Sequence, residues 1–125
     1  MAIRLKRAYE PAKRGDGTRV LVDRLWPRGV SKEAARIERW LKEIAPSTAL
    51  RKWFNHDPAK WETFRERYFR ELDRNVEGVN ELRALARGRT VTLVYSAKDE
   101  DHNQAVALKE YLSRSAAGGR PAGRR

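Results

Sequence analysis

The sequence of 125 residues contains no cysteine. This absence excludes disulfide bonds, thiolate nucleophiles and the cysteine-bearing zinc, iron–sulfur and haem sites. It is compatible with a reducing compartment. The sequence also lacks any run approaching about 18 apolar residues, and the cationic segment 1–10 has no apolar stretch typical of a signal peptide. We therefore expect a cytoplasmic protein without a membrane segment.

The common catalytic and nucleotide-binding motifs are also absent. The sequence contains no Walker motif, no glycine-rich dinucleotide-binding motif, no serine-hydrolase motif and no protein-kinase signature. It has only two histidines, His56 and His102, and their spacing matches no pair typical of metal ligands. We therefore predict neither a cofactor nor a metal site.

Positive charge is the strongest compositional feature. The formal net charge is +11, and residues 114–125 contribute four arginines and no acid, so residues 1–113 still carry +7. Such a charge favours association with phosphate groups, in nucleic acids, in nucleotides or on anionic surfaces. A genome rich in G and C would give the same arginine usage without a functional reason. Charge alone therefore does not choose a ligand.

Hydrophobic periodicity indicates strands that alternate with helices. We predict strands at residues 3–7, 19–23 and 90–95 and a short one near 38–41. We predict helices at residues 31–36, 46–54, 57–72, 75–86 and 100–113. This order predicts a single-domain α/β sandwich with a mostly parallel sheet flanked by helices. The domain is expected to span residues 1–114, with a disordered basic tail at 115–125.

Polar residues gather where two predicted strands end. Parallel α/β sheets bind ligands beyond the carboxyl ends of their strands, where helix N-termini present free N–H groups. We therefore expect the segments 23–28 and 96–103 to form one site, if their strands are neighbours. The predicted ligand-binding residues are Arg24, Trp26, Arg28, Lys98 and Asn103, and the candidates for proton transfer are Asp23, Asp99 and His102.

The same residues also have structural interpretations. Ser96 and Asp99 fit the pattern of a helix cap, which favours a purely structural role for the start of the last helix. Trp26 could pack over the edge of the core, and Arg24 could form an ion pair with Asp23. For His56, we expect a position at a helix joint with its ring hydrogen-bonded to nearby backbone.

Three segments carry a family resemblance. They are Val-Asp-Arg-Leu-Trp-Pro-Arg-Gly at 22–29, Ala-Pro-Ser-Thr-Ala-Leu-Arg-Lys-Trp-Phe-Asn-His-Asp-Pro at 45–58 and Leu-Val-Tyr-Ser-Ala-Lys-Asp-Glu-Asp-His-Asn-Gln-Ala at 93–105. In these segments the sequence resembles the YeaO-like branch of the family named domain of unknown function 488. The resemblance implies a small cytoplasmic α/β protein, with no assigned activity. Longer relatives carry a cysteine-rich segment at positions 95–103, so no catalytic residue is transferred to this chain.

Two functions remain in competition at this point. The first is a site for a small anionic or nucleotide-like ligand, with or without its chemical transformation. The alternative is a nucleic-acid-binding or regulatory module without catalysis, in which the net charge and the basic tail supply the affinity. A domain that binds a protein partner and performs no chemistry is a third interpretation.

Overall fold

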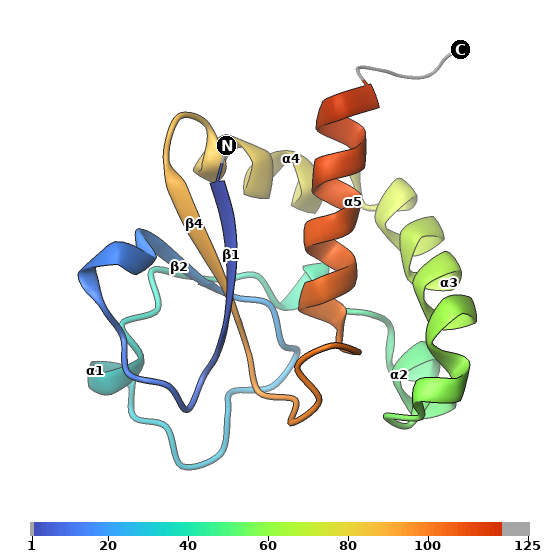
Figure 1. Cartoon of the computed structure of the whole chain (residues 1–125), viewed down its shortest axis with the longest axis horizontal. Helices are drawn as coiled ribbons and strands as arrows, with labels where there is room; N and C mark the ends of the chain where they lie inside the picture. Colours follow the sequence, from blue (N-terminus) through green and yellow to red (C-terminus); the bar gives the residue numbers. More distant parts are fainter. Residues whose placement is uncertain (1, 119–125) are drawn as a thin grey trace.

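The computed structural model describes residues 2–118, and their side chains as far as residue 114 (Figure 1). Four parallel strands form one sheet in the order β1-β4-β2-β3. The strands are β1 (Ala2–Arg7), β2 (Thr18–Leu21), β3 (Arg39–Trp40) and β4 (Thr90–Tyr95). The α-helices are α1 (Lys32–Ala35), α2 (Thr48–Phe54), α3 (Trp61–Arg74), α4 (Val76–Ala86) and α5 (Gln104–Gly118). The predicted single-domain α/β fold is confirmed, and every strand pair within residues 2–118 is parallel.

β4 lies in the interior of the sheet, between β1 and β2. Its sequence, Thr-Val-Thr-Leu-Val-Tyr, is rich in β-branched residues and typical of a strand, and all but its first residue are buried. β2 pairs with β4 in a register that places Leu21 opposite Val94. One residue further on, the Val22 N–H donates a hydrogen bond to the Val94 carbonyl (3.0 Å). The two strands therefore end side by side.

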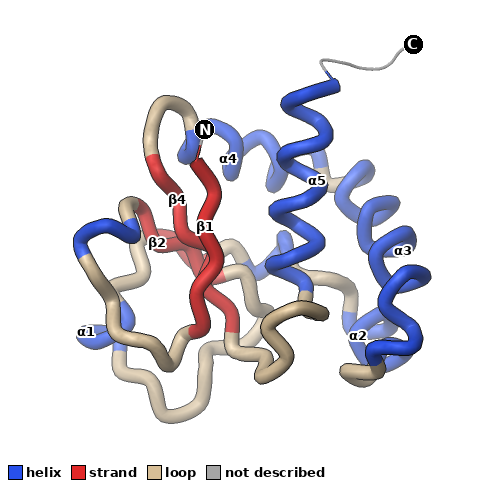
Figure 2. Tube along the Cα trace, in the orientation of Figure 1, coloured by secondary structure: helices blue, strands red, loops and turns tan. Residues whose placement is uncertain are grey.

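The two faces of the sheet are covered differently. Val20 and Leu93 point into the main core, to which α2, α3, α4 and α5 contribute their buried side chains. Leu21 and Val94 point to the opposite face, because successive residues of a strand alternate. Partly buried side chains from residues 26–40 cover that second face. Figures 1 and 2 show the resulting asymmetry, with α3, α4 and α5 on one side of the sheet and α1 on the other.

Most predicted helix starts are confirmed by their caps. The side chains of Ser31, Ser47 and Asn75 each accept a hydrogen bond from a backbone N–H in the first turn of α1, α2 and α4. The predicted start of the last helix at Glu100 is wrong, because α5 begins at Gln104.

α5 also continues to Gly118, past the end predicted at residue 113. Residues 119–125 of the predicted tail lie outside the described residues. No helix in the described part of the chain is long and apolar enough to cross a membrane.

Gly17 allows the chain to enter β2 directly beside β4. Its φ is +66°, and a Cβ at this position would lie 2.3 Å from the Thr90 carbonyl oxygen. We expect Gly17→Ala to lower the free energy of unfolding by more than about 2 kcal/mol, because left-handed strain and a backbone clash add. Gly88→Ala is the matched control, since Gly88 has a φ of +69° and open space around it. Equal losses in urea denaturation would show that the clash contributes nothing.

Candidate functional site

A cleft of about 550 Å³ lies beyond the carboxyl ends of β2 and β4. Its walls are residues 23–28, most of residues 51–56, and two parts of the segment before α5, residues 96–97 and 102–104. The loops that follow these strands lie together at the lower edge of the sheet in Figure 2. The expected adjacency of the two strands is confirmed by the β2–β4 pairing. The sheet therefore brings parts of both predicted polar segments into one cleft.

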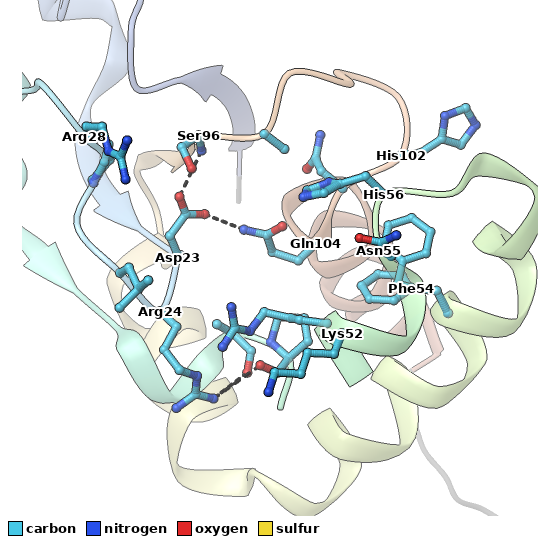
Figure 3. Close-up of a pocket in the computed structure, with 18 of the residues that line it drawn as sticks. Asp23, Arg24, Arg28, Lys52, Phe54, Asn55, His56, Ser96, His102 and Gln104 are labelled. Atoms are coloured by element: carbon cyan, nitrogen blue, oxygen red, sulfur yellow. Dashed lines mark hydrogen bonds between the residues drawn. The ribbon is translucent and has the colours of Figure 1, made fainter. Parts of the chain in front are cut away.

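Asp23 is the buried carboxylate of this cleft, with 7% of its surface exposed. Its Oδ2 accepts a hydrogen bond from the Ser96 N–H (3.0 Å), and its Oδ1 accepts one from the Gln104 amide (Figure 3). Burial raises the pKa of Asp23 above its ordinary value, and the hydrogen bonds from Ser96 and Gln104 and the charge of Arg51 oppose this rise. Asp23 thus joins the end of β2 to the end of β4 and to the start of α5.

Arg24 lines the cleft, but its guanidinium group points toward residues 43–46. Its Nη2 donates to the carbonyl oxygens of Ala45 (3.2 Å) and Pro46 (3.4 Å), and its Nη1 lies 3.5 Å from a Glu43 carboxylate oxygen. The structural interpretation that paired Arg24 with Asp23 is therefore wrong. The terminal nitrogens of Arg24 are engaged within the fold, whereas its buried Nε has no hydrogen-bond partner among the described residues.

Trp26 is half-buried and has both a structural contact and a place in the cleft wall. Its Nε1–H donates to the Val30 carbonyl (2.6 Å), and its ring packs edge-on against Trp40 with centroids 5.5 Å apart. Arg28 also lines the cleft and is exposed, and its backbone carbonyl accepts a hydrogen bond from the Tyr9 hydroxyl (3.1 Å). The guanidinium of Arg28 is therefore the more accessible one in this loop.

The Asp99 carboxylate organises the loop that leads to α5. It accepts hydrogen bonds from the backbone N–H groups of Asp101 and His102, and it lies 2.9 Å from the His102 Nδ1. The hydrogen bond with His102 lowers the pKa of Asp99. Neither Asp99 nor the exposed Lys98 belongs to the cleft lining.

His102 lies at the rim of the cleft. Its ring packs edge-on against Trp61 with a centroid distance of 5.3 Å. Figure 3 shows this ring turned away from Asp23. The structure therefore separates Asp23 and His102, two of the three residues that the sequence suggested for proton transfer.

Asn103 lines the cleft, and its side chain also starts α5. Its Nδ2 donates to the Asp99 carbonyl (2.9 Å), and its Oδ1 accepts from the N–H groups of Ala105 (2.9 Å) and Val106 (3.1 Å). Asn103 is only 2% exposed. It is the helix cap that the sequence pattern assigned to Ser96 or Asp99.

The sequence did not predict the wall at residues 51–56. Arg51, Lys52, Asn55 and His56 all line the cleft. The predicted joint at His56 is confirmed, since α2 ends at Phe54. The predicted hydrogen bond from the His56 ring to backbone is wrong, because none occurs within residues 2–118 and the ring instead faces Phe54 with centroids 6.4 Å apart. The sequence signal that could have pointed to His56 as a cleft residue was its position directly after the end of a helix.

The residues described by the structure include no group of three or more histidine or acidic side chains arranged to hold a metal ion. Both histidines line the cleft, together with Asp23 as its carboxylate.

Residues 2–122 match a family model described as "Inactive DUF488-N3 subclade". The chain is 45% identical over 112 residues to "Uncharacterized protein YeaO" of Escherichia coli, a match that covers 90% of this chain and 97% of that protein. It is 38% identical over 111 residues to "Uncharacterized protein Rv3073c" of Mycobacterium tuberculosis, covering 89% of this chain and 93% of that protein. No solved structure matches the chain. The chain therefore belongs to the domain of unknown function 488 family, in the subclade described as "Inactive DUF488-N3", and is YeaO-like within that family.

Proposed function

We propose that the cleft binds a small anionic, nucleotide-like ligand and does not transform it. The observation that carries this proposal is the charge of the lining. Four cationic side chains line the cleft, and Asp23 is the one carboxylate among its lining residues. The cations are Arg24, Arg28, Arg51 and Lys52. An apolar-walled cleft with such an excess of positive charge attracts anions and strengthens their hydrogen bonds.

Exposed apolar side chains at the mouth of the cleft support a ligand with a planar or apolar part. Leu25 is 72% exposed and Tyr9 is 49% exposed, and both line the cleft. In the described part of the chain, Val76 is the only other large hydrophobic residue that is exposed. The cleft volume of about 550 Å³ lies within the range of roughly 300–1,000 Å³ that is typical of small-molecule sites.

The absence of catalysis in this proposal rests on two further observations. Asp99 and His102 contact each other at 2.9 Å, but Asp99 lies outside the cleft lining and the His102 ring packs against Trp61, so the pair is separated from Asp23. The family description calls the subclade inactive. A ligand-sensing or ligand-carrying role fits both observations. We also propose that the protein acts in the cytoplasm, as its sequence predicts.

Removing one accessible cation from each of two walls should weaken ligand binding. For the double variant Arg28→Ala, Lys52→Ala we expect the Kd for adenosine monophosphate (AMP) to rise at least about tenfold, because a charged hydrogen bond contributes about 1.5–3 kcal/mol. Isothermal titration calorimetry at fixed ionic strength measures this change. Both side chains are exposed, so folding should be unaffected.

The matched control is the double variant Arg89→Ala, Lys109→Ala. It removes the same charge from exposed residues outside the cleft lining, and we expect AMP to bind it as it binds the wild type. Equal losses in both double variants would favour the nucleic-acid-binding alternative, in which total charge rather than the cleft supplies the affinity.

A further inference from the structure

The polar side chains of the wall at residues 51–56 are available to a ligand. We infer that the anionic group recognised by the cleft is a phosphate bound at this wall, and that His56 contacts it. This inference rests on the proposed function and adds the ligand class and its orientation. The wall consists of the last turn of α2 and the two residues after it, and five of its six residues line the cleft.

The cations of the two basic walls, at residues 23–28 and 51–56, differ in how far they are already engaged. Arg24 is held by Glu43 and by two backbone carbonyls. Arg51 donates from Nη2 to the Thr48 hydroxyl (3.2 Å). The buried Nε atoms of Arg24 and Arg51 both lack a hydrogen-bond partner within the described residues. Lys52 is exposed. The wall itself contains no acidic residue, whereas the loop at residues 23–28 contains Asp23, whose carboxylate also interacts with the charge of Arg51.

Arg51 and Lys52 alone would not indicate a ligand. Both lie in the last turn of α2, where cations also stabilise the negative end of a helix dipole. A residue indicates a ligand more strongly when the helix dipole does not account for its position. His56 is such a residue.

The backbone at Asn55 and His56 adopts two consecutive left-handed conformations, with φ of 47° and 54°. Residues other than glycine avoid this region, because Cβ approaches the backbone. Asn55 has an ordinary explanation. It ends α2, its N–H donates to the Arg51 carbonyl (3.0 Å), and asparagine tolerates this conformation at helix ends.

His56 lies in a turn that the Asp57 N–H closes by donating to the Phe54 carbonyl (3.0 Å), and histidine adopts positive φ more readily than most residues. The turn does not by itself require a histidine. His56 is exposed, and its ring makes only a tilted contact with Phe54. Glycine would adopt the same turn with less strain. Figure 3 shows the His56 side chain extending into the cleft, on the side of Gln104. A strained residue with its side chain directed into a cleft is typical of a ligand contact.

These positions give the ligand an orientation. Imidazole, amide, ammonium and guanidinium groups all supply N–H donors, and a phosphate group supplies several acceptor oxygens for them. The exposed apolar side chains of Leu25 and Tyr9 belong to other parts of the lining. The phosphate therefore lies at residues 51–56, and the apolar part of the ligand lies toward Leu25.

The test compares two variants with three probes, which are inorganic phosphate, AMP and adenosine. For His56→Gly we expect the Kd for phosphate and for AMP to rise about five- to tenfold and the Kd for adenosine to change less than about twofold. The melting temperature should stay within about 2 °C of the wild type, because glycine accepts the left-handed backbone. Leu25→Ala should raise the Kd for adenosine and for AMP and leave the Kd for phosphate unchanged.

Each other outcome contradicts a defined part of the account. If His56→Gly binds phosphate and AMP like the wild type while Arg28→Ala, Lys52→Ala does not, the cleft binds anions and our assignment of His56 is wrong. If the wild type binds none of the probes, the proposed function itself fails. His56→Asn, which also tolerates the left-handed backbone, guards against a folding defect. A fall of more than about 5 °C in both His56 variants would make His56 a structural residue and overturn the inference.

Discussion

Replacing Asp16 with alanine is expected to lower the free energy of unfolding by about 3–5 kcal/mol, because it leaves a buried arginine without its counter-charge. Asp16 and Arg19 are 6% and 3% exposed, and the Arg19 Nη1 lies 2.6 Å from the Asp16 Oδ2. Lys6 contacts the other carboxylate oxygen at 3.0 Å. Without Asp16, the guanidinium of Arg19 would retain the Ala35 carbonyl as its hydrogen-bond acceptor among the described residues. Urea denaturation at pH 7 measures the loss.

The pH dependence of stability provides a second measurement on the same variant. Burial alone would raise the pKa of Asp16, but hydrogen bonds from the Lys13 N–H, Lys6 and Arg19 outweigh it, so the pKa lies below its ordinary value. A lowered carboxyl pKa stabilises the fold above the unfolded-state value of about 3.9, and this contribution is lost as the pH falls through the folded-state pKa. Asp16→Ala should therefore lose less stability than the wild type on acidification below about pH 4.

The control removes a carboxylate from an exposed ion pair. Glu62 lies 2.9 Å from Arg65, and its side chain is 79% exposed. Glu62→Ala should cost less than about 1 kcal/mol. If Asp16→Ala costs no more than Glu62→Ala, the buried cluster does not stabilise the fold.

The second large effect is expected for Phe64→Ala, at about 3–5 kcal/mol. Phe64 is 2% exposed and stacks on Phe54 with ring centroids 4.3 Å apart, and both rings line the cleft. Removing this ring opens a cavity where α2 packs on α3. Because α2 carries the wall at residues 51–56, the variant should also bind AMP more weakly at temperatures where it is folded.

Phe69→Ala is the matched control for this change. Phe69 lies on the same helix but is only partly buried, beside Tyr111 at a centroid distance of 5.4 Å. We expect a cost below about 2 kcal/mol and no change in AMP affinity. If Phe69→Ala weakened AMP binding as much as Phe64→Ala, stability rather than packing beneath the cleft would explain both results.

The strand positions and the adjacency of the two loops beyond the ends of β2 and β4 could be predicted from the sequence. The β-branched segment at residues 90–95 and the capping serines before α1 and α2 have strong local signals, because their propensities depend on neighbouring residues alone. The general rule for parallel sheets then placed Asp23 and the loop after β4 at one edge. The structure confirms this adjacency through the β2–β4 pairing.

The remaining features depend on tertiary structure. The rule for parallel sheets points to loops that follow strands, and α2 follows no long strand. Arg51 and His56 reach the cleft because α2 packs beside the strand ends in the folded chain. Ser96 and Asp99 match the sequence pattern of a capping box, but neither caps α5. Asn103 caps it, because its buried side chain accepts hydrogen bonds from the N–H groups of Ala105 and Val106. The partners of Arg24, contributed by residues 43–46, are likewise brought to it by the fold.

Backbone amide chemical shifts during titration with AMP, recorded by NMR, test the central claim most directly. The account predicts that the largest shifts cluster in residues 23–28, 51–56 and 96–104, around the lining of one cleft. Binding that is diffuse should perturb amides beside exposed arginines across the described surface. Shifts concentrated on α3 and α4 away from the cleft, or an absence of shifts at AMP concentrations of about 10 mM, would contradict an anion-binding cleft at the ends of the sheet.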